Sequence, residues 1–164
     1  MNIPRQDIEL LAEQERRLVL PAIDADLPWQ LGQRLRELAL ARGAAVTIEI
    51  RINRETVFFH AMPGVTPANA DWARRKRNTV ELLQQSSYRV GLELKRDASS
   101  LEAKMGLPTR DYASHGGSFP LQLVGIGTIG TVTVSGLPQR EDHAMVVEAL
   151  EPFCGLAEGS LALD

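Results

Sequence analysis

The sequence has a single cysteine, no long apolar run and no excess of positive charge, and each of these absences excludes a class of protein. Cys154 alone cannot form an internal disulfide or a thiolate metal cluster. The longer apolar runs, at residues 18–23 and 144–147, are far shorter than the ~20 residues of a membrane helix. With 18 basic and 21 acidic residues, the net charge of -3 gives no general attraction for nucleic acid or an anionic membrane.

The remaining composition is that of an ordinary folded protein. Apolar residues make up 44% and charged residues 24%, and 164 residues can bury a single core, so we expect one domain over residues 1–164. The N-terminal sequence is charged where a signal peptide would be apolar. We therefore expect a cytoplasmic protein that partners neither nucleic acid nor a membrane.

Apolar residues at helical spacing predict several helices. Gly43 is a suitable C-terminal end for the second helix, and Thr66 and Pro67 are suitable as the N-cap and first residue of the third. The predicted ranges are 6–17, 27–42, 67–85, 88–96, 101–105 and 139–150.

Two hairpins are predicted between these helices. Residues 46–52 alternate apolar and polar, and the β-branched and aromatic run 56–61 follows a turn at 53–55. Residues 118–124 and 126–134 form a second hairpin around Gly125. Because the elements do not form successive βαβ units, we expect an α+β protein with a mainly antiparallel sheet and helices packed against it.

Residues 125–130 match the G-x-G-x-x-G pattern of dinucleotide-binding loops. That chemistry requires the loop to open into a helix N-terminus, but the β-branched run Thr131–Val134 follows instead. The glycines are therefore predicted to form a hairpin turn and to allow another backbone to approach closely.

The basic run at residues 74–77 does not form one patch, because successive helical residues are separated by about 100°. Lys76 falls on the buried stripe with Ala73 and Val80, whereas Arg75 points toward solvent or a partner subunit. Lys76 has two interpretations. It either buries its stem and keeps its ammonium in water, or binds an anion at the edge of a pocket.

The histidines His60, His115 and His143 lack the spacing of a local zinc motif. His115 lies in the small-residue loop 113–118, where backbone amides and the imidazole either face a ligand or form an ordinary turn. The sequence leaves both interpretations open.

Ser135, Asp142 and His143 suggest a hydrolase triad. However, the chain has no G-x-S-x-G elbow, and an aspartate next to its histidine on a helix points to a different face. A capping role for Asp142 is therefore favoured over serine hydrolase chemistry.

Several short motifs are spread along nearly the whole chain: Gln14-Glu15-x-x-Leu18, Trp29-x-Leu31-Gly32, Asp71-Trp72, Ser86-Ser87-Tyr88, His115 to Pro120, Val134 to Pro138 and Asp142-His143. Together with residues 73–80, they resemble uncharacterised protein family 0303, a branch of the GlcG-like superfamily of haem-degrading-domain proteins. The superfamily pattern A-x-x-K-A-x-T-A is similar to residues 73–80, where Lys76 and Thr79 match and Arg77 and Val80 depart.

The resemblance implies a profilin-like α-β-α layered fold around a five-stranded, mainly antiparallel sheet, together with symmetric homo-oligomers. It implies no single activity. Some superfamily members bind or degrade haem, and others accompany glycolate or corrinoid metabolism. Fold analogy alone does not choose among these activities.

The leading hypothesis is a cytosolic oligomeric protein that binds haem or a small carboxylate near the sheet edge, between the third helix and two glycine loops. In this hypothesis Lys76 holds the anionic group, and His115 or His143 supplies a neutral imidazole for iron or for hydrogen bonding. The residues predicted to bind ligand are Lys76, His115, Ser118, Ser135 and His143.

Two alternatives belong to other functional classes. A haem-degrading enzyme requires iron with a position open for oxygen and an external reductant, but no residue in the sequence demands such a reaction. An oligomeric scaffold would use Trp72, Arg75 and Tyr88 as subunit contacts, because aromatic and arginine side chains anchor interfaces. The sequence therefore assigns no catalytic residue and no cofactor, although haem is a candidate cofactor. The scaffold remains an alternative interpretation of the same motifs.

Overall fold

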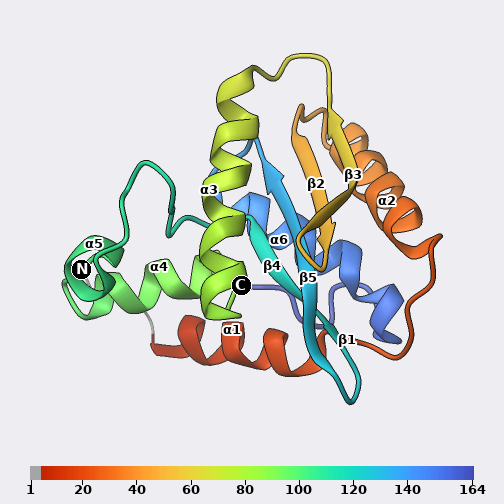
Figure 1. The fold of residues 1–164 in the computed structure, drawn as a ribbon. Helices are drawn as coiled ribbons and strands as arrows, with labels where there is room; N and C mark the ends of the chain where they lie inside the picture. The colour runs from red at the N-terminus through yellow and green to blue at the C-terminus, as the bar shows by residue number, and fades with distance from the viewer. Residues whose placement is uncertain (1–4) are drawn as a thin grey trace.

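The computed structural model describes residues 5–164, which form one mixed sheet with helices on both of its faces (Figure 1). Positions 1–4 of the predicted domain lie outside the described residues. The elements in chain order are α1 (Arg5–Arg17), β1 (Val19–Leu20), α2 (Leu27–Ala41), β2 (Thr47–Ile52), β3 (Glu55–Ala61), α3 (Pro67–Leu83), α4 (Ser87–Arg96), α5 (Leu101–Met105), β4 (Ser118–Leu123), β5 (Gly127–Ser135), α6 (Gln139–Leu150) and η1 (Pro152–Cys154).

The five strands lie in the order β1-β4-β5-β2-β3. Both predicted hairpins, β2–β3 and β4–β5, are present, and β5 joins them by pairing antiparallel with β2. The expected α+β class with a five-stranded, mainly antiparallel sheet is therefore confirmed. Strand β1 was not predicted. It pairs parallel with β4 over two residues, which are too few for an alternating pattern to be visible.

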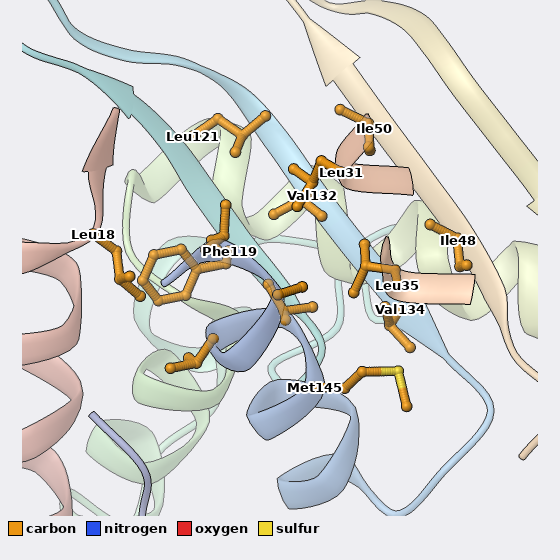
Figure 2. Close-up of a cluster of buried hydrophobic side chains, with 14 of the residues drawn as sticks. Leu18, Leu31, Leu35, Ile48, Ile50, Phe119, Leu121, Val132, Val134 and Met145 are labelled. Atoms are coloured by element: carbon orange, nitrogen blue, oxygen red, sulfur yellow. The ribbon is translucent and has the colours of Figure 1, made fainter. Parts of the chain in front are cut away.

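The apolar core lies on one face of the sheet, beneath α2 and α6 (Figure 2). Leu31 and Leu35 of α2 and Met145 of α6 are fully buried there. From the sheet they meet the fully buried side chains Ile48, Ile50, Phe119, Val132 and Val134. Burying a leucine or isoleucine side chain is worth about 1.5–3 kcal/mol, so this layer is the main source of stability.

The opposite face of the same strands, beneath α3, is polar. Side chains alternate between the two faces of a strand, so the residues between those of the core point toward α3. They are Thr47, Glu49, Thr131, Thr133 and Ser135, and all five are buried. Helix α3 contributes its own polar side chains to this interface. Among them is Arg77, whose Nε lies 3.1 Å from Glu49 Oε1. The position of α3 therefore depends on specific polar pairs as well as on apolar packing.

Helix α3 begins where the sequence predicts. Thr66 is extended and forms a capping box with Asn69, and Pro67 is the first helical residue. The helix ends at Leu83, two residues earlier than predicted, because Gln84 adopts a left-handed conformation with φ 55°. None of the helices in residues 5–164 is long and apolar enough to cross a bilayer.

The glycine-rich segment forms the turn between β4 and β5 and then continues as strand. Gly130 lies so close to β2 that a Cβ atom there would overlap the carbonyl oxygen of Arg51. The close backbone approach predicted for these glycines is confirmed, and the segment does not open into the helix that a dinucleotide loop needs.

Candidate functional site

A cleft of about 270 Å³ lies where β5 ends and the chain turns into α6. Helix α3 forms one wall, the loop before β4 contributes His115, and the start of α6 closes the other side. The lining residues are Asn69, Trp72, Lys76, His115, Ser135, Gly136, Leu137, Gln139 and Asp142. The fold therefore brings three of the predicted ligand-binding residues, Lys76, His115 and Ser135, into one cleft.

Lys76 and Asp142 form a buried ion pair in the wall of this cleft. Lys76 Nζ lies 3.0 Å from Asp142 Oδ2 and 3.1 Å from the carbonyl oxygen of Val134. Lys76 is only 4% exposed, so its ammonium does not extend into water in the manner of the first interpretation. Burial lowers the pKa of Lys76 and raises that of Asp142, while the attraction between the two charges opposes both shifts.

Asp142 also fixes the turn between β5 and α6. Its Oδ1 accepts a hydrogen bond from the amide of Leu137 at 2.9 Å, and its Oδ2 accepts one from Gly136 at 3.3 Å. This carboxylate therefore caps the turn that leads into α6, close to the role favoured from the sequence, and holds Lys76 at the same time.

Gly117 packs directly against the ion pair. Its φ of +134° is a conformation that L side chains rarely adopt. A Cβ atom there would lie 2.6 Å from Lys76 Nζ and would overlap the carbonyl oxygen of Val134. The glycine is thus required so that the loop carrying His115 can approach the ammonium.

Trp72, Arg75 and His115 form a contiguous group at the rim. The guanidinium carbon of Arg75 lies 4.3 Å from the centre of the Trp72 ring, and the His115 ring lies edge-on to Trp72 at 5.2 Å. Partial burial lowers the pKa of His115, and the positive charges of Lys76 and Arg75 lower it further. His115 is therefore a neutral imidazole at pH 7, able to donate a hydrogen bond or to bind a metal ion.

The structure places His143 in the protein interior, away from the cleft lining. It is 1% exposed, its Nε2 lies 2.7 Å from Gln14 Oε1, and its ring packs against Tyr88 and Phe119. Burial, together with the charge of Arg140, lowers the pKa of His143 to about 3. Asp142 and His143 thus make contacts in different directions, and they do not form a triad with Ser135.

Two other residues selected from the sequence are buried in the protein interior. Ser118 is fully buried, with its Oγ 2.8 Å from Thr133 Oγ1. Tyr88 is 6% exposed, and its hydroxyl lies 3.3 Å from Arg140. Residues 5–164 contain no group of three histidine, cysteine, aspartate or glutamate side chains placed to hold a metal ion.

Asn69 and Gln139 were not predicted as cleft residues, and Trp72 was predicted only as a subunit contact, but all three line the cleft. The position of Asn69 could be recognised in the sequence, because it lies three residues after the N-cap Thr66, where a capping-box side chain is expected. In the structure its Oδ1 accepts a hydrogen bond from the Thr66 amide at 3.2 Å. Gln139 Oε1 accepts a hydrogen bond from the amide of Gly116 at 3.0 Å. This contact joins segments distant in sequence, so no local pattern predicts it.

A larger cavity of about 470 Å³ lies at the opposite end of β5, near Thr128 and Gly130. Its one acidic lining residue, Glu81, is paired with Arg51 at 3.1 Å. It contains none of the residues predicted to bind ligand. The smaller cleft, with its buried ammonium and neutral imidazole, is therefore the better candidate site.

Comparison with known proteins assigns the fold and its class. Residues 23–151 match the family described as haem degrading protein, HbpS-like. Among solved structures, the chain is similar to the Ybr137w protein, with a TM-score of 0.84 and 27% identity over 94% of this chain and 90% of that one.

The chain is also similar in fold to PduOC, solved as a complex with haem, with a TM-score of 0.68 and 19% identity over 79% of this chain and 93% of that one. A UPF0303 protein of Azotobacter vinelandii is 53% identical over all of this chain and 98% of its own length. A UPF0303 protein of Burkholderia thailandensis is 54% identical over 96% of this chain and 95% of its own length. The chain therefore belongs to the UPF0303 family, within the HbpS-like haem-degrading-domain proteins.

Proposed function

We propose that this protein binds a small organic anion in the cleft between α3, the His115 loop and the start of α6. The observation that carries the proposal is the buried ammonium of Lys76 in the cleft wall. An ammonium has three N–H donors, and the described residues supply acceptors for two of them, at Val134 and Asp142. A carboxylate oxygen in the cleft would accept the third donor and would also accept an N–H from the neutral His115.

The charge and size of the cleft support a small ligand with one negative charge. Lys76 and Asp142 neutralise each other, and Arg75, which lies over Trp72 beside the cleft and does not line it, supplies a further positive charge nearby. The volume of about 270 Å³ lies just below the roughly 300–1,000 Å³ of sites that enclose drug-sized ligands. A molecule with one or two rings matches this space.

Titration of ¹⁵N-labelled protein with benzoate and with cyclohexanecarboxylate, followed by NMR, tests the proposal. We expect saturable shifts at the amides that surround the cleft, including Gly116, Gly136 and Leu137. Replacing His115 with alanine should weaken binding by about three- to tenfold, the value of one hydrogen bond. His60→Ala is the matched control, because His60 lies on β3 and does not line the cleft.

If neither carboxylate produced saturable shifts at these amides, the proposal would be wrong. Equal binding by wild-type protein and His115→Ala, with shifts still confined to the cleft, would remove His115 from the site but leave the site itself in place.

Haem is a second candidate ligand, favoured by the solvent-accessible neutral imidazole of His115 and by the haem complex of PduOC. Histidine is a common axial ligand of haem iron, and bound haem would supply redox chemistry at that position. The cleft is too small to enclose the macrocycle, so much of it would lie outside.

An absorbance titration with ferric haem tests this candidate, with serum albumin as the control for nonspecific uptake. We expect a saturable Soret shift at a fixed stoichiometry, lost in His115→Ala and retained in His60→Ala. An unchanged titration in His115→Ala would exclude His115 as the iron ligand. Loss of the band under reductant, with catalase present, would then indicate haem degradation as well as binding.

A further inference from the structure

Trp72 is the large aromatic side chain of the cleft, and it is held in place before any ligand binds. Arg75 covers the ring at 4.3 Å, and its Nε and Nη2 both donate to the carbonyl oxygen of Thr109, at 3.1 and 2.6 Å. His115 packs edge-on against the same ring. The Trp72 side chain nevertheless remains 37% exposed and lines the cleft.

A fixed, partly exposed indole favours one class of ligand. Aromatic rings attract each other in offset and edge-to-face arrangements beyond what burial of their area contributes. Because Arg75 and His115 already restrict the ring, little conformational freedom is lost when a second ring packs against it. A saturated ring of the same size gains the burial but not the specific ring–ring attraction.

The polar groups of the cleft lie close to this aromatic wall. Lys76, His115 and Trp72 all line the cleft, and Arg75 lies beside it, over the Trp72 ring at 4.3 Å. The amide side chains of Asn69 and Gln139 complete the lining without adding charge. A ligand suited to this arrangement has a flat apolar ring and a carboxylate at one end.

We infer that the cleft selects planar aromatic carboxylates, with the carboxylate at Lys76 and His115 and the ring packed against Trp72. This inference rests on the proposed anion site and adds the class of ligand. Trp72 is the specificity-determining residue, because it contacts the part of the ligand that distinguishes an aromatic acid from an aliphatic one.

The chain offers a convenient internal control. Its other tryptophan, Trp29, lies on α2, on the other side of the sheet, where it packs edge-on against Phe58 at 5.8 Å. Trp29 is 64% exposed and does not line the cleft. In Trp29→Phe protein, the tryptophan fluorescence therefore comes from Trp72 alone.

The test compares benzoate with cyclohexanecarboxylate, which has the same charge and a similar size but a puckered ring. In Trp29→Phe protein we expect both to change the Trp72 fluorescence saturably, with benzoate binding about two- to tenfold tighter. In Trp72→Leu, measured by calorimetry, the two affinities should become equal at about the cyclohexanecarboxylate value. Trp72→Phe should keep part of the preference.

The outcomes separate the inference from the proposal on which it rests. Equal affinities for the two acids in protein that retains Trp72, or a benzoate preference that survives in Trp72→Leu, would overturn the aromatic selection while leaving the anion site intact. Failure of both acids to bind would overturn the anion site and the selection together.

Discussion

Replacement of Lys76 by methionine is expected to lower the free energy of unfolding by about 3–5 kcal/mol, the usual cost of removing one partner of a buried ion pair. The variant leaves the Asp142 carboxylate buried without its opposite charge. The amides of Gly136 and Leu137 still donate to that carboxylate, but they carry no net charge to balance it. Urea denaturation measures the loss.

Two further variants make this result specific. The double variant Lys76→Met with Asp142→Asn removes the buried charge while keeping an acceptor oxygen for the turn, so it should recover a large part of the lost stability. Lys104→Met breaks the exposed pair with Asp97 and should cost far less stability, because water screens both charges. Similar losses for Lys76→Met and Lys104→Met would show that the buried pair has no special structural role.

The second large effect is expected on acidification, because His143 is buried in its neutral form. The pKa of His143 in the folded protein is about 3, compared with an ordinary value of 6.5. Below pH 6.5 His143 binds a proton in the unfolded chain but stays neutral in the folded protein. The stability that His143 contributes above pH 6.5 is therefore lost as the pH falls toward 3. The slope reaches up to about 1.4 kcal/mol per pH unit from this residue alone.

Urea denaturation at intervals between pH 7 and pH 5 measures this slope before most carboxyl groups titrate. His143→Gln removes the titrating ring and should flatten the dependence, whatever its stability at pH 7. A slope in His143→Gln equal to that of wild-type protein would assign the acid sensitivity to other groups.

Most of the fold could be predicted from local patterns, because apolar periodicity, glycines and caps decide local structure. The capping residues Thr66 and Pro67 start α3 as expected, and the β-branched run after Gly130 correctly predicted strand in place of a nucleotide loop. Strand β1 was not predicted, because its two residues are held by pairing with β4, a contact about 100 residues away in sequence.

The candidate site could be predicted less completely, because its geometry depends on contacts between distant segments. Periodicity correctly placed Lys76 on the buried side of α3, but it does not reveal that the ammonium would meet Asp142 from the start of α6. The sequence could not distinguish His115 from His143 as the available imidazole. Tertiary packing separates them, leaving one at the rim of the cleft and enclosing the other against α1, α4 and β4.

The apolar core lies on one face of the sheet, and the polar layer with its cleft lies on the other. This separation affects which positions can change among related sequences. Exposed rim positions such as Trp72 and His115 can change without touching the side chains that stabilise the fold. The Lys76–Asp142 pair and Gly117 cannot, because each depends on the others. Evolution of new ligand preferences on this scaffold should therefore proceed by exchange of rim residues around a constant ion pair.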